Sequence, residues 1–217
     1  MKFHPVLGAL LLVSGAVTSA DHSGAVRRKL DLLPMVDLRH DRVHGSWELK
    51  DGVLRCTLEE PAARVMIPYL PPEEYDLIVT AERTEGKDAF VMGLASGDAQ
   101  FVHVLDGYTA EGKCLSGFET LDGLLARSNE STREGQRFAN GTPSVLSYSV
   151  RRRRVTVAVN GERVLDWKGD FKRLSVRPDY RINNAGVLFV GAYNSRYRIT
   201  RVSLYPVGLL GRTLRDK

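Results

Sequence analysis

The sequence predicts an all-β protein, a two-sheet antiparallel sandwich, from three observations. About a dozen short segments carry alternating apolar and polar residues, and turn residues separate them roughly every ten positions. Segment 154–167 is the clearest, because Asn160-Gly161 interrupts its alternation with the pair that favours a tight type I′ hairpin turn. No segment shows the apolar period of a convincing amphipathic helix.

The predicted register of this hairpin separates its two faces. A two-residue turn would place Val159 opposite Glu162, Val157 opposite Val164 and Val155 opposite Asp166. The valines would then form the core face. Trp167 would end the second face, which is small and half polar, and which is either lightly covered or receives a ligand.

The remaining strands follow from the same alternation. Segment 69–74 is rich in proline, which lacks the donor that a sheet interior needs, so we expect it to be extended and not to join the interior of a sheet. The other predicted strands are 47–58 with a turn at Asp51-Gly52, 64–67, 75–83, 90–95, 100–105, 114–121, 144–150, 187–193 and 197–205.

The first twenty residues have the pattern of a secretory signal peptide. Lys2 gives a positive start, residues 6–17 are mostly apolar, and small residues precede a cleavage point after Ala20. The alternative is a buried N-terminal helix. The apolar run is shorter than the ~20 residues that cross a bilayer. The sequence therefore predicts a secreted or periplasmic protein. Its predicted parts are a signal peptide at 1–20, an N-terminal extension at 21–39, the sandwich at 40–207 and a basic tail at 208–217. We expect the tail to be frayed.

The charge distribution and the apolar runs of the sequence limit the classes of partner that we expect. The formal net charge of the 217 residues is +5, and it is spread along the chain rather than concentrated on one face, which argues against nucleic acid as a partner. No apolar run after residue 20 is long enough to span a membrane.

Cys56 and Cys114 either form a disulfide, as an oxidising compartment allows, or remain as two buried free thiols. The oligomeric state does not follow from the sequence.

Several short segments, taken in their order along the chain, carry a family resemblance. They are 47–54, 64–69 with 71–76, Asp106-Gly-Tyr108, Ser116-Gly117, Asn129-Glu-Ser-Thr132, 157–171 and 197–201. Over residues 40–207 the chain resembles the concanavalin A-like lectin/glucanase jelly roll. Within that fold it is similar to secreted bacterial domains related to the 3-keto-disaccharide hydrolase (DUF1080) family. The resemblance implies a jelly-roll sandwich, a fold that hosts lectins, glycosidases and interaction modules alike.

A glycosidase needs two carboxyl groups that flank the scissile bond. The resemblance implies that a glucanase would carry them as Glu-x-Asp-x-(x)-Glu along one strand, and this chain has no such motif; Glu73, Glu74 and Asp76 come nearest, at a proline-flanked strand entrance. For any single carboxylate a surface or turn role is favoured over catalysis. Five carboxylates could still converge from separate strands, and Glu82 and Asp106 are the weak catalytic candidates among them. The five are Glu82, Asp106, Glu119, Glu130 and Asp170.

Sugar binding needs an aromatic platform with polar groups nearby. Trp167 is the ambiguous platform, because it equally suits a plug at the end of the sandwich, stacked by Arg154. The candidate platforms are Trp167, Tyr108 and Tyr193, and the candidate polar partners are Gln100, Asn129, Glu130, Asp170 and Asn194.

No cofactor or metal is expected. The histidines are scattered without metal-ligand spacing, and His103 alternates with Phe101 and Leu105 as a core residue would. Related lectins bind calcium through loop carboxylates, but no Asp-x-Asp-x-Asp loop supports calcium here. Three hypotheses remain: a secreted glycan-binding module without catalysis, a hydrolase acting on a modified disaccharide or glucoside, and a structural or adhesion domain without a sugar site. The first is favoured.

Overall fold

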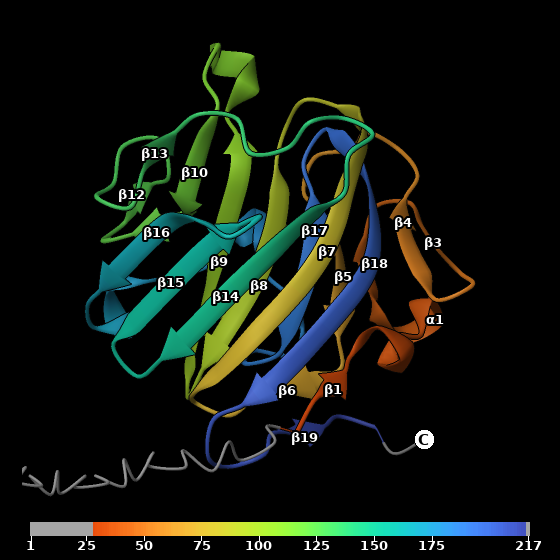
Figure 1. Ribbon diagram of the computed structural model, residues 1–217, viewed down its shortest axis with the longest axis vertical. Helices are drawn as coiled ribbons and strands as arrows, with labels where there is room; N and C mark the ends of the chain where they lie inside the picture. The colour runs from red at the N-terminus through yellow and green to blue at the C-terminus, as the bar shows by residue number, and fades with distance from the viewer. Residues whose placement is uncertain (1–27, 216–217) are drawn as a thin grey trace, which may run out of the picture.

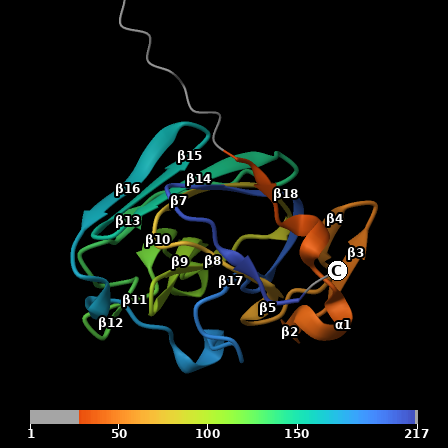
Figure 2. The same cartoon turned by 90° about the horizontal axis from the view of Figure 1, so that it is seen from below.

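The computed structural model describes residues 28–215, and it is a sandwich of two antiparallel sheets (Figures 1 and 2). The predicted signal peptide lies outside the described residues. The eight-stranded sheet contains, in spatial order, β16 (Glu162–Lys168), β15 (Arg154–Val159), β14 (Ser144–Arg151), β7 (Tyr75–Gly86), β18 (Ser195–Pro206), β4 (Val53–Cys56) and β3 (Trp47–Lys50), with β1 (Leu30–Asp31) also paired to β18.

The second sheet has seven strands and packs face to face against the first (Figure 2). Its strands, in spatial order, are β13 (Arg133–Glu134), β10 (Leu115–Phe118), β9 (Ala99–Gly107), β8 (Phe90–Ser96), β17 (Leu188–Ala192), β5 (Ala63–Ile67) and β2 (Arg42–His44). Two small ladders complete the set: β11 (Thr120–Leu121) with β12 (Leu124–Leu125), and β6 (Tyr69–Leu70) with β19 (Arg212–Thr213).

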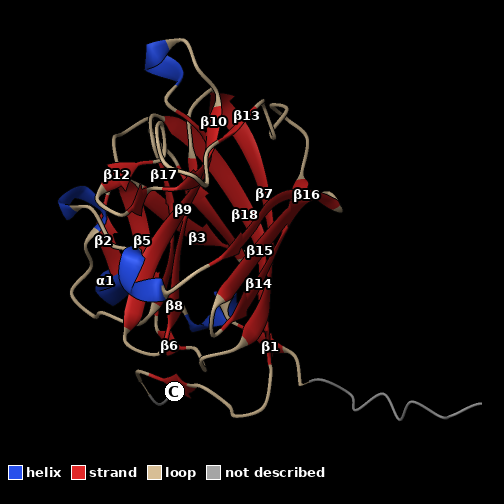
Figure 3. Ribbon diagram, turned by 90° about the vertical axis from the view of Figure 1, so that its left-hand side faces the viewer, coloured by secondary structure: helices blue, strands red, loops and turns tan. Residues whose placement is uncertain are grey.

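Within residues 28–215, helical structure is confined to short pieces between strands (Figure 3). They are the α-helix α1 (Leu38–Asp41) and the 3₁₀ turns η1 (Leu33–Met35), η2 (Thr109–Glu111), η3 (Phe171–Arg173) and η4 (Pro178–Tyr180). Among the described residues, no helix has the length and apolar character needed to cross a membrane.

The core lies between the two sheets and is built by alternation. In β7, Leu77 and Val79 are fully buried, and in β9 Phe101 and Leu105 face the same core. Because successive side chains of a strand point to opposite faces, the residues between them lie outside. On the seven-stranded sheet these outer positions are also apolar and form a second, smaller cluster that includes Val102.

The hairpin has the predicted turn but a different register. Asn160 and Gly161 both have positive φ, 50° and 84°, and Val159 pairs with Glu162. A bulge then shifts the ladder, so that Val157 pairs with Leu165 and Val155 with Trp167. The predicted pairs for Val155 and Val157 are therefore wrong. One extra residue in β16 turns Leu165 and Trp167 towards the core, where their apolar area is removed from water.

The two cysteines lie at different sheets. Cys56 ends β4 of the eight-stranded sheet, and Cys114 directly precedes β10 of the seven-stranded sheet. Both are free thiols, and burial raises the pKa of each to about 11. Of the two predicted states, the structure shows the unbridged one.

The C-terminal segment is tied to the body of the domain. The tail was expected to fray, and for residues 212–215 that prediction is wrong. β19 pairs with β6, and Arg215 donates two hydrogen bonds, of 2.8 and 2.6 Å, to the fully buried carboxylate of Asp41. The Arg215 guanidinium is the cationic partner of the buried Asp41 carboxylate, and loss of this partner would leave a buried charge unpaired. This ion pair therefore holds the C-terminal segment against the domain.

His103 lies in the core between the sheets, as the alternation of β9 predicts. It is 1% exposed and packs edge-on against Phe118 and Tyr148. Within the described part of the chain neither ring nitrogen has a hydrogen-bond partner, and burial lowers the pKa of His103 to about 3.

We expect His103 to make the domain sensitive to acid. Its pKa is lower in the folded than in the unfolded chain, so below about pH 6.5 the unfolded state binds more protons and the free energy of unfolding falls by roughly 1.4 kcal/mol per pH unit down to about pH 3. Denaturant unfolding at pH 7.5 and pH 4.5 measures this loss. His103→Phe should lose roughly 2 to 3 kcal/mol less between these two values; equal losses in the two proteins would contradict the prediction.

Candidate functional site

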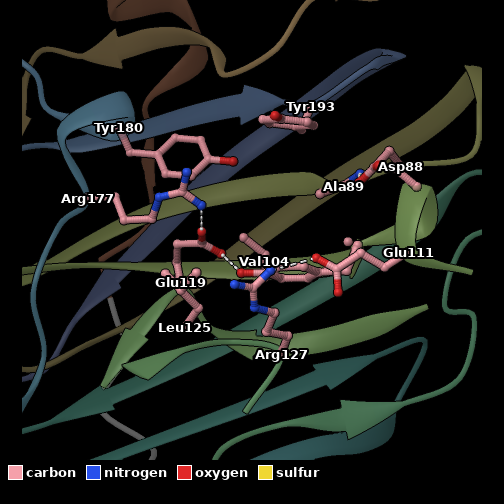
Figure 4. Close-up of a pocket in the computed structure, with 13 residues that line it drawn as sticks. Asp88, Ala89, Val104, Glu111, Glu119, Leu125, Arg127, Arg177, Tyr180 and Tyr193 are labelled. Atoms are coloured by element: carbon pink, nitrogen blue, oxygen red, sulfur yellow. Dashed lines mark hydrogen bonds and ion pairs between the residues drawn. The ribbon is translucent and has the colours of Figure 1, made fainter. Parts of the chain in front are cut away.

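A pocket of about 350 Å³ opens on the outer face of the seven-stranded sheet, away from the core (Figure 4). Val104 of β9 lies at its base. Its walls come from the β9–β10 connection, the loop that follows β12, and segment 175–186 before β17. The lining residues are Asp88, Ala89, Val104, Gly107, Tyr108, Ala110, Glu111, Glu119, Leu125, Arg127, Arg177, Tyr180 and Tyr193.

Tyr108 enters the pocket through an unusual backbone conformation. Its φ of 66° lies in the left-handed region, where a bulky side chain is rare and costs about 1–3 kcal/mol. Such a conformation persists only where the surroundings fix it. Here the phenolic hydroxyl donates a hydrogen bond of 3.1 Å to Oε2 of Glu119, so the strained residue is held against a buried carboxylate.

Glu119 is the most buried charged group of the pocket. It follows β10 directly, its amide donates to the carbonyl of Val102, and it is 2% exposed. Its Oε1 accepts a 2.5 Å hydrogen bond from Arg177. Burial raises the pKa of Glu119 above its ordinary value, while the hydrogen bonds from Arg177 and Tyr108 act in the opposite direction.

The segment Arg177-Pro-Asp-Tyr180 closes one side of the pocket. Arg177 bridges Glu119 and Asp179, with a 2.5 Å bond to each, and its guanidinium lies 6.0 Å from the ring centre of Tyr180. Tyr180 is 3% exposed and packs on the outer apolar cluster of the sheet. In Figure 4 its hydroxyl points into the pocket, opposite Tyr193, which directly follows β17.

The remaining charged groups at the pocket also have hydrogen-bond partners. Arg127 donates a 2.8 Å hydrogen bond to Glu111 at the more exposed rim. The carboxylate of Asp88 accepts from the amide of Ala89 at 2.8 Å and from the hydroxyl of Thr109 at 2.7 Å. The described residues contain no group of three His, Cys, Asp or Glu side chains that could hold a metal ion.

Of the residues that the sequence singles out, Tyr108 and Tyr193 line this pocket. They are joined there by Glu119, from the wider set of carboxylates. Gln100 and Asp170 instead line a second, open cavity of about 650 Å³ at the other end of β9, where Gln100 Nε2 donates to the carbonyl of Val187. Asn194 and the remaining candidates belong to neither cavity.

Trp167 lies in the core rather than at a ligand site. It is 5% exposed, stacks on Phe171 with ring centres 6.0 Å apart and meets Phe118 edge-on at 5.3 Å. Its Nε1 donates a 2.8 Å hydrogen bond to Glu130, which also pairs with Arg173. Of the two predicted roles the structure places Trp167 in that of a plug, and Glu130 serves as its hydrogen-bond partner. The predicted stacking partner, Arg154, pairs instead with Asp166.

Asn129 has a structural environment. Its amide nitrogen donates to the carbonyls of Phe118 and Leu124, and its oxygen accepts from the amide and hydroxyl of Ser131. With both ends of the amide engaged, Asn129 holds the loop that forms one wall of the pocket and offers little to a ligand.

The two weak catalytic candidates do not share a cavity. Glu82 of β7 pairs with Arg198 across the eight-stranded sheet. Asp106 is fully buried and pairs with Arg83 of the opposite sheet. The φ of Asp106, 60°, interrupts the alternation of β9 there, and its carboxylate also accepts from the amides at 137 and 138.

Sequence reasoning missed Arg177, Tyr180 and Arg127. All three lie in connections without strand pattern: Arg177 and Tyr180 between β16 and β17, and Arg127 between β12 and β13. A usable signal existed: loops over a rigid sheet often carry binding residues, and 175–186 combines arginine, proline and tyrosine between η3 and β17.

No protein-family model and no curated protein matches the chain. Several solved structures, in contrast, are similar to it. The chain is similar to the carbohydrate binding module CBM66 from Bacillus subtilis, at 8% identity and a TM-score of 0.52 over 76% of this chain and 93% of that one. It is similar to the Crh5 transglycosylase at 11% identity and a TM-score of 0.55, over 85% of each chain.

A third similar structure is the exoplasmic/lumenal domain of VIP36 in its Ca²⁺/Man2-bound form, at 14% identity and a TM-score of 0.52, over 76% of this chain and 80% of that one. At these identities the likeness shows the fold alone, which is a jelly-roll sandwich; membership of the concanavalin A-like superfamily is a prediction. The more specific resemblance to the 3-keto-disaccharide hydrolase family stays a prediction.

Proposed function

We propose that the protein is a secreted glycan-binding module that holds a saccharide unit in the pocket around Glu119 and does not cleave it. The observation that carries the proposal is the pocket itself. Three tyrosines surround a buried carboxylate, and the volume of about 350 Å³ falls within the range of small-ligand sites. Phenol rings offer apolar faces to a pyranose, and their hydroxyls bond to its hydroxyls.

The structural neighbours support a saccharide as the ligand. The structure from Bacillus subtilis is a carbohydrate binding module, and the VIP36 domain was solved in a Ca²⁺/Man2-bound form. Secretion rests on the signal-peptide pattern of residues 1–20. The absence of catalysis rests on the carboxylates: beside Glu119 the pocket offers Asp88, whose two oxygens accept protein hydrogen bonds, and Glu111, which is paired with Arg127.

One observation favours a hydrolase as the second candidate. The raised pKa of Glu119 is what a general acid needs near neutral pH. A hydrolase would act on a modified disaccharide or glucoside, and it would release products that chromatography detects.

Tyr193→Ala is expected to weaken glycan binding at least about tenfold, since the ring supplies one face of the pocket and 1.4 kcal/mol corresponds to that factor. A glycan array identifies the ligand, and calorimetry on the best binder measures the affinity. Tyr205→Ala is the matched control, because Tyr205 belongs to β18 of the other sheet and is remote from the pocket lining.

Two outcomes would contradict the proposal. If the wild-type protein retains no glycan on the array, the binding function is wrong. If it cleaves its ligand, and Glu119→Gln abolishes the cleavage while retaining binding, the hydrolase takes its place.

A further inference from the structure

The base of the pocket is limited to a short part of β9. Val104 lies at this base, and the next outward residue of the strand, Val102, is 1% exposed within the outer apolar cluster. Val176 and Ile182 pack against the same cluster, so the segment before β17 covers the sheet there. In the opposite direction the strand ends, and Tyr108 and η2 follow. Within the described residues, the pocket therefore does not continue as a groove along the sheet.

The side chains that line the pocket surround Val104 on all sides (Figure 4). Figure 4 shows Glu111 on the side opposite Arg177, and Arg127 on the side opposite Tyr193. These four residues belong to four different connections between strands. A pocket with walls on four sides and a strand as its base has one mouth, which faces away from the sheet.

Hydrogen bonds join neighbouring walls of the pocket to one another. In η2, the hydroxyl of Thr109 donates to Oδ2 of Asp88 at 2.7 Å. Glu111 of the same turn accepts a 2.8 Å hydrogen bond from Arg127. The turn is thus bonded to the walls on both of its sides, and a glycan chain could pass through this end of the pocket only if these bonds broke.

The volume of the pocket also limits what it can hold. About 350 Å³ lies near the lower end of the range of small-ligand sites, roughly 300–1,000 Å³. One saccharide unit suits such a volume, whereas a run of several consecutive units needs an extended groove.

We infer that the pocket binds the terminal saccharide unit of a glycan and does not bind units in the interior of a chain. The inference rests on the proposed glycan-binding function and names the part of the glycan that is recognised. An interior unit is linked on both sides, so its site must be open at two ends. A terminal unit is linked on one side only, and it can enter through a single mouth while the rest of the chain extends into solvent.

The test measures how affinity depends on chain length. The probes are glucose, galactose, mannose, xylose and galacturonic acid, each as its methyl glycoside and as linear oligomers of two, four and six units, titrated by calorimetry. For the sugar that binds, the Kd is expected to vary by less than about threefold between the methyl glycoside and the hexamer, because every chain presents one end that fits. An open groove would instead gain affinity with each added unit.

Gly107→Leu is expected to weaken binding of the methyl glycoside at least about tenfold, because it fills the base of the pocket. The φ of Gly107 is not positive, and a Cβ atom there would lie 3.6 Å from Cβ of Ala89 and 3.9 Å from Cγ2 of Val104, which are ordinary contacts. A leucine side chain would therefore extend into the pocket without backbone strain. Thr156→Leu, on β15 of the other sheet, is the matched control and should bind as the wild type does.

The two proposals fail in distinguishable ways. A Kd that falls steadily with chain length, in a protein whose binding Tyr193→Ala still weakens, would keep the glycan-binding function and overturn the recognition of chain ends. Unchanged binding by a Gly107→Leu protein with a folded melting transition would overturn it too; if this variant does not fold, the length series of the wild type decides alone. Absence of binding to every probe would overturn both the function and this inference.

Discussion

Arg83→Met is expected to lower the free energy of unfolding by about 3–5 kcal/mol, the usual cost of leaving one member of a buried ion pair alone. Arg83 is 2% exposed and joins several elements: it donates to Asp106 at 3.2 Å, to Asn140 at 2.7 Å and to the carbonyl of Phe138 at 2.7 Å. Methionine fills much of the same space but donates none of these bonds. Asp106 would keep its backbone donors and lose its cation.

Denaturant unfolding at pH 7 measures the loss, with Arg198→Met as the control. Arg198 pairs with Glu82, but its side chain is 41% exposed, and a solvent-exposed pair is worth at most about 1 kcal/mol. Because the Arg83–Asp106 pair lies next to Tyr108, weaker glycan binding is expected in the folded fraction of Arg83→Met as well. A loss no larger than that of the control would contradict the structural role of the pair.

Trp167→Ala is expected to cost about 3–5 kcal/mol, because it removes a large ring from a close-packed interior and leaves a cavity. The ring contacts Phe118 and Phe171, and its indole N–H is bonded to Glu130. Trp167→Phe keeps an aromatic ring in the site and should lose clearly less. Thermal and denaturant unfolding of the three proteins give the comparison.

The same variants separate the two roles predicted for Trp167. As a plug, Trp167 affects stability, so Trp167→Phe should retain the glycan affinity of the wild type at a temperature where it is folded. As a sugar platform, it would affect affinity with little loss of stability. Lost binding in a fully folded Trp167→Phe protein would contradict the core assignment.

The strand content and the sandwich could be predicted because their signals are local. Alternation with a period of two and turn pairs such as Asn160-Gly161 depend on the conformations that a few neighbouring residues allow, so the sequence states them directly. The hairpin turn is confirmed by positive φ at Asn160 and Gly161. Burial of His103 followed from the same alternation.

The register beyond the turn could not be predicted in the same way. A two-residue turn sets the first pair, Val159 with Glu162. The bulge in β16, however, depends on how Leu165 and Trp167 pack against side chains of the core. Because one extra residue exchanges the faces of a strand, this single feature moved Trp167 from the predicted ligand face into the core.

The sequence by itself determined an all-β chain, its main strands and two of the pocket tyrosines, Tyr108 and Tyr193. Only the tertiary structure decided which charged groups meet: Arg177 and Glu119 are 58 residues apart and bond only because a loop folds back over the sheet. The left-handed backbone at Asp106 likewise turned that carboxylate to Arg83 and away from the pocket. The physical reason is that alternation and turn preference are properties of neighbouring residues, whereas ion pairs and pockets depend on distances that only the folded chain sets.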